Sequence, residues 1–129
     1  FIRIGLGGCD IGTSYFLPRL VGVSVASELI LTGRFIGAER ALAVGLVSDV
    51  VEESQLEAAA EPYIDAMLTA SPVGLRLSKE CLNMSVDAPS IEAAIAMEDR
   101  NQVLCSRSED FNEGIRAFLE KRKPVYVRR

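Results

Sequence analysis

The chain has 129 residues, of which 49% are hydrophobic and 25% are charged, and it carries a formal net charge of −4. This length suits one domain or part of a larger one, and the apolar fraction excludes intrinsic disorder. A mildly acidic chain is a poor ligand for nucleic acid or an anionic membrane, and no run approaches the roughly 20 apolar residues of a membrane span. We therefore expect a soluble protein that binds neither.

The residue types that are absent or scarce restrict which catalytic and metal sites the chain can contain. The sequence has no His, which is the usual general base and the commonest zinc ligand, and we expect no metal site. Its three cysteines, Cys9, Cys81 and Cys105, are far apart and odd in number. That pattern indicates free thiols in a reducing compartment, so we expect a cytoplasmic protein without a disulfide framework.

The first part of the chain predicts two short strands and several helices. Residues 1–6 are mostly apolar and predict the end of a buried strand, and residues 46–51 predict another short strand. Between them we expect a glycine-rich loop, a helix from Thr13 that Pro18 kinks or interrupts, and helices over about 23–31 and 38–44. Strands need partners for their backbone groups, and the chain opens as though in mid-strand, with neither an initiator Met nor a visible secretory signal. We therefore expect a fragment whose remaining sheet precedes Phe1.

The remaining part of the chain predicts helices almost throughout. Ser54, Ser71, Ser90 and Ser108 each suit the start of a helix, because a serine hydroxyl accepts a hydrogen bond from a free N–H of the first turn. The first two of these helices are expected to reach about residues 69 and 86, and the last two carry apolar residues as far as 103 and 119. Most of these amphipathic helices need a surface to cover.

The glycine-rich loop is the first candidate site. Its sequence GLGGCD places Asp10 where a dinucleotide-binding loop needs its last glycine, and a carboxylate there would repel a pyrophosphate. A phosphate-binding loop of the G-K-[ST] type is also absent from the sequence. Two interpretations of Asp10 stay open on the residues alone: a helix-capping acid near Gly12 and Thr13, or a carboxylate that handles protons where a strand meets a helix.

Four spaced segments carry a resemblance to a known family. They are IGLGGCDIGTSYFLPRLVG, ASELILTGRFIGAERALAVGLVSDVV, SPVGLRLSKECLN and SEDFNEGIRAFLEKRKPVY. Together they closely resemble the crotonase superfamily, the enoyl-CoA hydratases and isomerases, and only the C-terminal half of a member. The resemblance implies an α/β fold, a β-spiral with helices, of which this chain is the mostly helical C-terminal portion. It also implies that residues 1–51 form the end of the spiral core with the active-site loop, and residues 52–129 a helical oligomerisation region.

The family chemistry implied by this resemblance needs neither His nor a metal. Two backbone N–H groups polarise a thioester carbonyl, and carboxylates beside the reacting carbons move protons or activate water. Many hydratases of this family use two glutamates, and the second of them stands where this chain has Phe1. The chain therefore departs from the two-glutamate pattern. Asp10 resembles instead the loop aspartate of the dienoyl-CoA isomerases and the aryl-CoA dehalogenases, with a role as general acid or base more than as nucleophile. Cys9 beside it is interpreted as a small packing residue.

The basic end of the chain is the second candidate site. By the same resemblance, Phe118 and Lys121 look like the pair that contacts the adenine and phosphate end of CoA, often in a neighbouring subunit. The alternative is that these residues are only a solvated, positively charged helix end, because the helix dipole favours cations at a C-terminus. The two interpretations have equal weight. No cofactor is implied, since CoA enters as part of the substrate.

Two hypotheses about function follow. The first is an enoyl-CoA hydratase or isomerase that acts on acyl-CoA thioesters through an enolate-like intermediate, completed by the N-terminal half of the same protein and assembled as a trimer or hexamer. The second is a catalytically inactive helical assembly module, because the residues of the oxyanion hole and the first acid are expected outside this chain. On the first hypothesis, the isolated chain is expected to be inactive.

Overall fold

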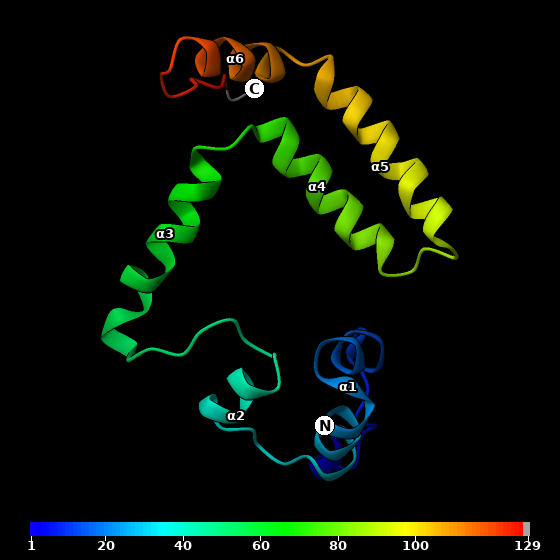
Figure 1. Ribbon diagram of the computed structural model, residues 1–129. Helices are drawn as coiled ribbons and strands as arrows, with labels where there is room; N and C mark the ends of the chain where they lie inside the picture. Colours follow the sequence, from blue (N-terminus) through cyan, green and yellow to red (C-terminus); the bar gives the residue numbers. More distant parts are fainter. Residues whose placement is uncertain (128–129) are drawn as a thin grey trace. The chain divides into compact units, whose positions relative to one another are not determined.

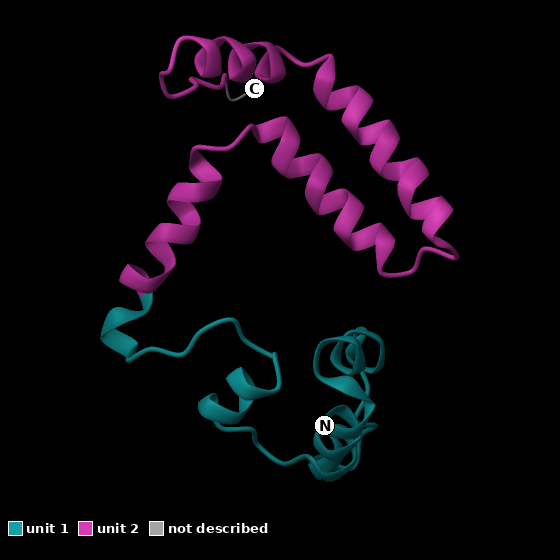
Figure 2. Ribbon diagram, in the orientation of Figure 1, with its two compact units in different colours: residues 1–56 teal, residues 57–129 magenta. Residues whose placement is uncertain are grey.

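The computed structural model describes residues 1–127, and the chain divides into two compact units, residues 1–56 and 57–129 (Figures 1 and 2). The described residues contain helical elements alone. In the first unit these are η1 (Ile2–Ile4), α1 (Thr13–Thr32), α2 (Ala38–Ala43) and η2 (Glu53–Gln55). The second unit contains most of α3 (Leu56–Leu68), then α4 (Pro72–Ser85), α5 (Ile91–Ser106) and α6 (Glu109–Leu119).

The prediction of two short strands is wrong for the residues that the structure describes. Residues 2–4 form the 3-10 turn η1, and residues 46–51 follow an irregular path. A β-strand needs a neighbour for its N–H and C=O groups, and neither segment pairs with another one in residues 1–127. The first segment satisfies part of its backbone locally instead, through bonds from Ile4 N–H to the Phe1 carbonyl (3.0 Å) and from Gly5 N–H to the Ile2 carbonyl (3.3 Å).

Helix α1 is broken just before residue 23, where the sequence predicts the second of two helices to begin, and not at Pro18. The backbone of Gly22 leaves the helical conformation, with φ 78° and ψ 159°, whereas Pro18 lies inside the helical run. By length and composition alone α1 could cross a membrane, with a mean hydropathy of 1.3 over its best window. The break at Gly22 divides α1 into two stretches of about 15 Å each. Because a membrane core is about 30 Å thick, neither stretch is long enough to cross it alone.

The second unit is held by an antiparallel pair of helices, α4 and α5, which run side by side (Figure 1). Serine caps begin three helices as expected: Ser71 accepts from Gly74 N–H (3.0 Å), Ser90 from Ala93 N–H (3.3 Å) and Ser108 from Phe111 N–H (3.1 Å). These caps act locally, so the sequence alone is enough to place the starts of α4, α5 and α6.

Two buried polar side chains link the helices of this unit. The amide of Asn101 on α5 donates to the Leu77 carbonyl (3.0 Å) and to Cys81 Sγ (3.2 Å) on α4. The carboxylate of Asp110 on α6 accepts from the Ser71 hydroxyl at 2.6 Å, so the cap of α4 is itself tied to the first turn of α6. Because unpaired polar groups are costly when buried, these bonds fix how the three helices meet.

Most large apolar side chains of the described residues remain exposed. The buried apolar residues are Ala26, Ala41, Leu77 and Ala117, and only Leu77 is large. Phe35 is 90% exposed and Phe118 80%. Exposure of large apolar side chains on this scale is unusual for a monomeric protein.

Candidate functional site

The glycine loop is shaped by close backbone contact with α1. A Cβ placed on Gly8 would lie 2.5 Å from the carbonyl oxygen of Ile30, so only glycine allows the loop to approach the helix this closely. Ile11 and Gly12 then adopt left-handed backbone conformations, with φ 40° and φ 90°. A β-branched residue pays a steric penalty there, which marks the loop as locally strained.

Asp10 lies in this loop and is exposed. Its Oδ1 accepts from the N–H of Ile11 at 2.8 Å, and its backbone carbonyl accepts from the N–H and the hydroxyl of Thr13 at 2.9 and 2.7 Å. The N-cap residue of α1 is Gly12, with no side-chain capping bond. The side chain of Asp10 is therefore turned onto its own loop, and it is the backbone of Asp10, not the carboxylate, that meets the first turn of α1.

Phe118 and Lys121 lie together at the end of α6, whereas Asp10 belongs to the first unit. The helix ends with two bonds that satisfy its last carbonyls, from Lys121 N–H to Phe118 (3.2 Å) and from Arg122 N–H to Ala117 (3.0 Å). This pairing is the Schellman motif, which needs a left-handed residue, and Lys121 supplies it with φ 53°. Glycine is the usual residue at that position, so a lysine there is a departure from the common pattern.

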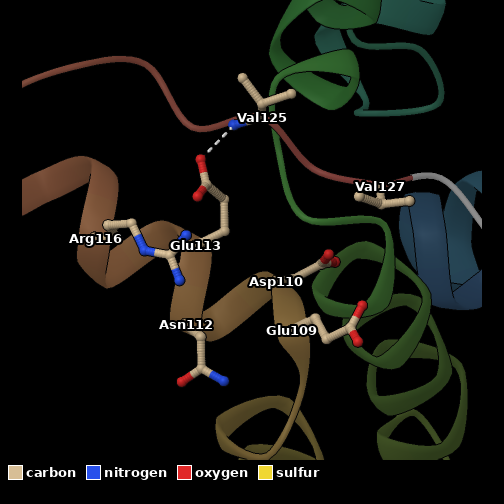
Figure 3. Close-up of a pocket in the computed structure, with 7 residues that line it drawn as sticks. All are labelled: Glu109, Asp110, Asn112, Glu113, Arg116, Val125 and Val127. Carbon is tan, nitrogen blue, oxygen red and sulfur yellow. Dashed lines mark hydrogen bonds between the residues drawn. The ribbon is translucent and has the colours of Figure 1, made fainter.

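Charged groups around α6 hold the following segment in place. Both carboxylate oxygens of Glu113 pair with the guanidinium of Arg122. Oε1 of Glu113 also accepts from Val125 N–H at 2.8 Å, the bond drawn as a dashed line in Figure 3. The bonds from Arg122 and from Val125 lower the pKa of Glu113 from 4.5 to about 2, and the same contact raises the pKa of Arg122. Both groups are charged at any pH near neutrality.

A pocket of about 330 Å³ opens beside these charged groups, between α6 and the segment that follows it (Figure 3). Its lining contains the carboxylates of Glu109, Asp110 and Glu113 but only one cation, Arg116. Excess negative charge does not suit the phosphates of a CoA nucleotide. Among residues 1–127, no group of three or more His, Cys, Asp or Glu side chains is arranged to hold a metal ion.

Sequence reasoning missed the residues that organise this second region. Nothing in the sequence pattern marks Glu113, and Arg122 belongs to the basic helix end, for which one interpretation is a solvated cationic terminus, although the two residues form an ion pair. Asn101 and Asp110 were likewise not identified as the polar links between helices. The one signal available for Asp110 was an acid two residues after the serine cap of α6, which also suits the positive end of that helix.

Comparison with known proteins identifies the family. The family model for enoyl-CoA hydratase/isomerase matches residues 1–129. The chain is 38% identical over 127 residues to a probable enoyl-CoA hydratase of Mycobacterium tuberculosis, covering 98% of this chain and 45% of the relative. It is 37% identical over 122 residues to the short-chain-enoyl-CoA hydratase of Clostridium acetobutylicum, covering 94% of this chain and 46% of the relative.

A solved structure agrees with these sequence matches. The crystal structure of an enoyl-CoA hydratase from Bacillus anthracis superposes with a TM-score of 0.89 at 34% identity, covering 97% of this chain and 48% of that one. The chain thus spans about half the length of the relatives that it matches, and corresponds to their C-terminal portion. Its helices are those of the crotonase fold. On the sequence match and the structural match together, the chain belongs to the enoyl-CoA hydratase/isomerase family.

Proposed function

We propose that the protein carrying this chain hydrates an enoyl-CoA thioester or moves its double bond, through an enolate-like intermediate. The observation that carries the proposal is the match of the family model to all 129 residues. The relatives named above are hydratases, and they support lyase chemistry of this class. In such a reaction the enolate charge is stabilised by backbone N–H groups, and we place these outside residues 1–129.

Asp10 is proposed as the acid or base that this chain contributes. Its carboxylate is exposed, and one of its oxygens is oriented by the Ile11 N–H. A carboxylate held in this way is fit to exchange a proton with a substrate carbon or with water once a second surface encloses it. Because Phe1 stands where many hydratases have a glutamate, Asp10 is the acid in this loop to which we assign the proton transfer.

Phe118 and Lys121 are proposed to contact the adenine and phosphate end of CoA. Phe118 is 80% exposed and offers an aromatic face, and Lys121 offers a compact cation one turn further on. The acidic pocket beside α6 is not part of this proposal, since its carboxylates would repel phosphate.

The remaining partners of the chain are also proposals. We propose that the N-terminal half of the same protein covers the apolar face of the first unit, and that copies associate as a trimer or hexamer. The support is the exposed apolar surface of both units, such as Phe35 in the first and Leu119 in the second, which are 90% and 73% exposed.

The catalytic assignment is tested by replacing Asp10 with asparagine in the intact protein and measuring turnover of crotonyl-CoA. Loss of a positioned acid or base is expected to lower kcat by about 10²- to 10⁴-fold without unfolding the protein. Asp49→Asn is the matched control, since Asp49 is exposed in the same unit and its Oδ1 also accepts from the next N–H, at 2.7 Å. Equal activity of Asp10→Asn and Asp49→Asn would return Asp10 to a local structural role.

The second candidate function is a helical assembly module without catalysis. The exposed apolar faces favour it as much as they favour an enzyme, because both need a covering partner. Gel filtration and a turnover assay on the intact protein separate the two. An oligomer without turnover of any enoyl-CoA would support the module, and turnover that depends on Asp10 would exclude it.

A further inference from the structure

The C-terminal end of α6 is held by a network centred on Arg122. Its Nη2 donates to Glu113 Oε2 at 3.0 Å while Nη1 donates to the other carboxylate oxygen, nine residues back along the chain. The Nε of the same guanidinium donates to Glu120 Oε2 at 2.6 Å. A guanidinium that meets both oxygens of one carboxylate fixes direction as well as distance, which a single-point contact does not.

Glu113 also holds the segment that follows the helix. Its Oε1 accepts from the N–H of Val125 at 2.8 Å, as Figure 3 shows, while Arg122 Nη1 donates to the Lys123 carbonyl at 3.1 Å. A Cβ on Gly114 would lie 3.4 Å from the hydroxyl of Tyr126, so the same segment packs against α6 itself. Glu113 therefore binds the helix end and the returning segment at once, and its side chain is only 18% exposed.

Lys121 lies inside this network although its own side chain is not part of it. Its neighbours Glu120 and Arg122 bond to each other across it, and the Schellman bonds fix its N–H and that of Arg122. A left-handed backbone is strained for lysine, so the conformation of Lys121 persists only where surrounding contacts impose it. The network thus fixes the backbone from which the side chains of Lys121 and, one turn earlier, Phe118 project.

We propose that Glu113 and Arg122 are positioning residues that hold Phe118 and Lys121 in the arrangement that receives the nucleotide end of CoA. The inference rests on the proposed function, since it concerns the same substrate. Its physical basis is preorganisation: an exposed aromatic ring and an exposed lysine bind a ligand more tightly when their backbone is already ordered. Neither Glu113 nor Arg122 is required to touch the ligand.

The test measures kcat and KM of the intact protein with two thioesters of the same enoyl acid. One is the CoA thioester, and the other is the N-acetylcysteamine thioester, which lacks the nucleotide. For Glu113→Ala we expect KM for the CoA thioester to rise about 3- to 10-fold, with kcat changed by less than about twofold, because an ordered contact is lost. KM for the short thioester is expected to stay unchanged.

Two further variants make the readout specific. Glu109→Ala is the matched control, since Glu109 lies on the same helix and lines the same pocket but takes no part in the bonds described above, and it is expected to leave both KM values unchanged. Arg122→Lys keeps the positive charge without the two-pronged geometry and is expected to raise KM for the CoA thioester alone. Equal changes for both thioesters, or none in Glu113→Ala, would overturn the inference.

Nucleotide binding separates this inference from the proposed reaction. Calorimetry with adenosine 3′,5′-bisphosphate, the nucleotide end of CoA, needs no catalytic step. If the intact protein turns over no enoyl-CoA but binds this nucleotide, and Glu113→Ala binds it about 3- to 10-fold more weakly, the proposed reaction fails while the positioning role holds. If the unaltered protein does not bind the nucleotide, the positioning role is overturned even where turnover is found.

Discussion

The two units of the chain differ in what holds their helices. In residues 57–127, Leu77 is buried between paired helices, and the side chains of Asn101 and Asp110 link α5 and α6 to α4. In residues 1–56 the buried residues are two alanines, Ala26 and Ala41, and the loop lies against α1 by backbone contact. The side-chain link between helices in this unit is an ion pair on the surface, from Arg40 of α2 to Glu28 of α1, with bonds of 2.9 and 2.6 Å.

This difference indicates which contacts stabilise each unit. The side chains that bond one helix to another in the second unit, Asn101 and Asp110, are buried, whereas the Glu28–Arg40 pair of the first unit is partly exposed and is expected to contribute less. Both units leave most of their large apolar residues exposed, so they differ in the burial of their polar links and not in apolar coverage. The candidate acid, Asp10, lies in the first unit, and the candidate nucleotide contacts, Phe118 and Lys121, lie in the second.

The largest expected effect comes from truncating the buried leucine of the second unit. Leu77 is 5% exposed, so Leu77→Ala is expected to lower the free energy of unfolding by about 2–5 kcal/mol. Leu31→Ala in α1 is the matched control: this leucine is 71% exposed, and the expected loss is below about 0.5 kcal/mol. Urea unfolding of the chain, followed by circular dichroism, measures both. Equal losses would show that the two units are not held differently.

A smaller effect is expected from crowding the loop of the first unit. Gly8→Ala places a methyl group 2.5 Å from the Ile30 carbonyl oxygen, and is expected to lower the free energy of unfolding by about 1–3 kcal/mol. Gly7→Ala is its control, because nothing lies within 4 Å of a Cβ at that position. That change is expected to be neutral or to stabilise by up to about 1 kcal/mol. If both alanines behave alike, the loop does not rest on α1 as described.

The smallest effect is a pH dependence confined to the second unit. The pKa of Glu113 falls from 4.5 to about 2 in the folded chain, because Arg122 and the Val125 N–H donate to its carboxylate. A lowered pKa means that the contribution is complete above pH 4.5 and is lost as the pH falls toward 2. The difference in Tm between the unaltered chain and Glu113→Gln should therefore shrink over that range. A difference that stays constant or widens in acid would contradict the assigned contacts.

Local signals predict most of the helix starts but not the path of the apolar segments. Ser54 is the exception among the four serines, since it lies within the 3-10 turn η2 and α3 begins at Leu56. Ser71, Ser90 and Ser108 cap their helices within three residues of sequence, and each cap was predicted. The apolar runs at residues 1–6 and 46–51 were predicted to be strands, and they are not. A strand depends on a distant partner that sequence spacing does not reveal, whereas a helix satisfies its backbone within itself.

The candidate site also combines features that the sequence predicts with features that it does not. The glycine-rich loop marks Asp10 as a candidate on the residues alone, and family resemblance favours its catalytic interpretation over a capping one. Phe118 and Lys121 are identified through family resemblance, since an exposed aromatic residue or lysine has no local pattern that marks a function. The pairing of Glu113 with Arg122 spans a turn that reverses the chain, so periodicity within α6 could not predict it. The left-handed conformation of Lys121 was equally hidden, because glycine is the usual sequence signal for such a turn.

Crotonyl-CoA hydration by separate halves tests the central claim most directly. The 129 residues are assayed alone, and then mixed with the N-terminal half of an enoyl-CoA hydratase relative supplied as a second polypeptide. The account predicts no turnover by either piece, recovered turnover in the mixture, and loss of that turnover when this chain carries Asp10→Asn. Rapid hydration by the 129 residues alone, or a mixture in which Asp10→Asn changes nothing, would contradict it.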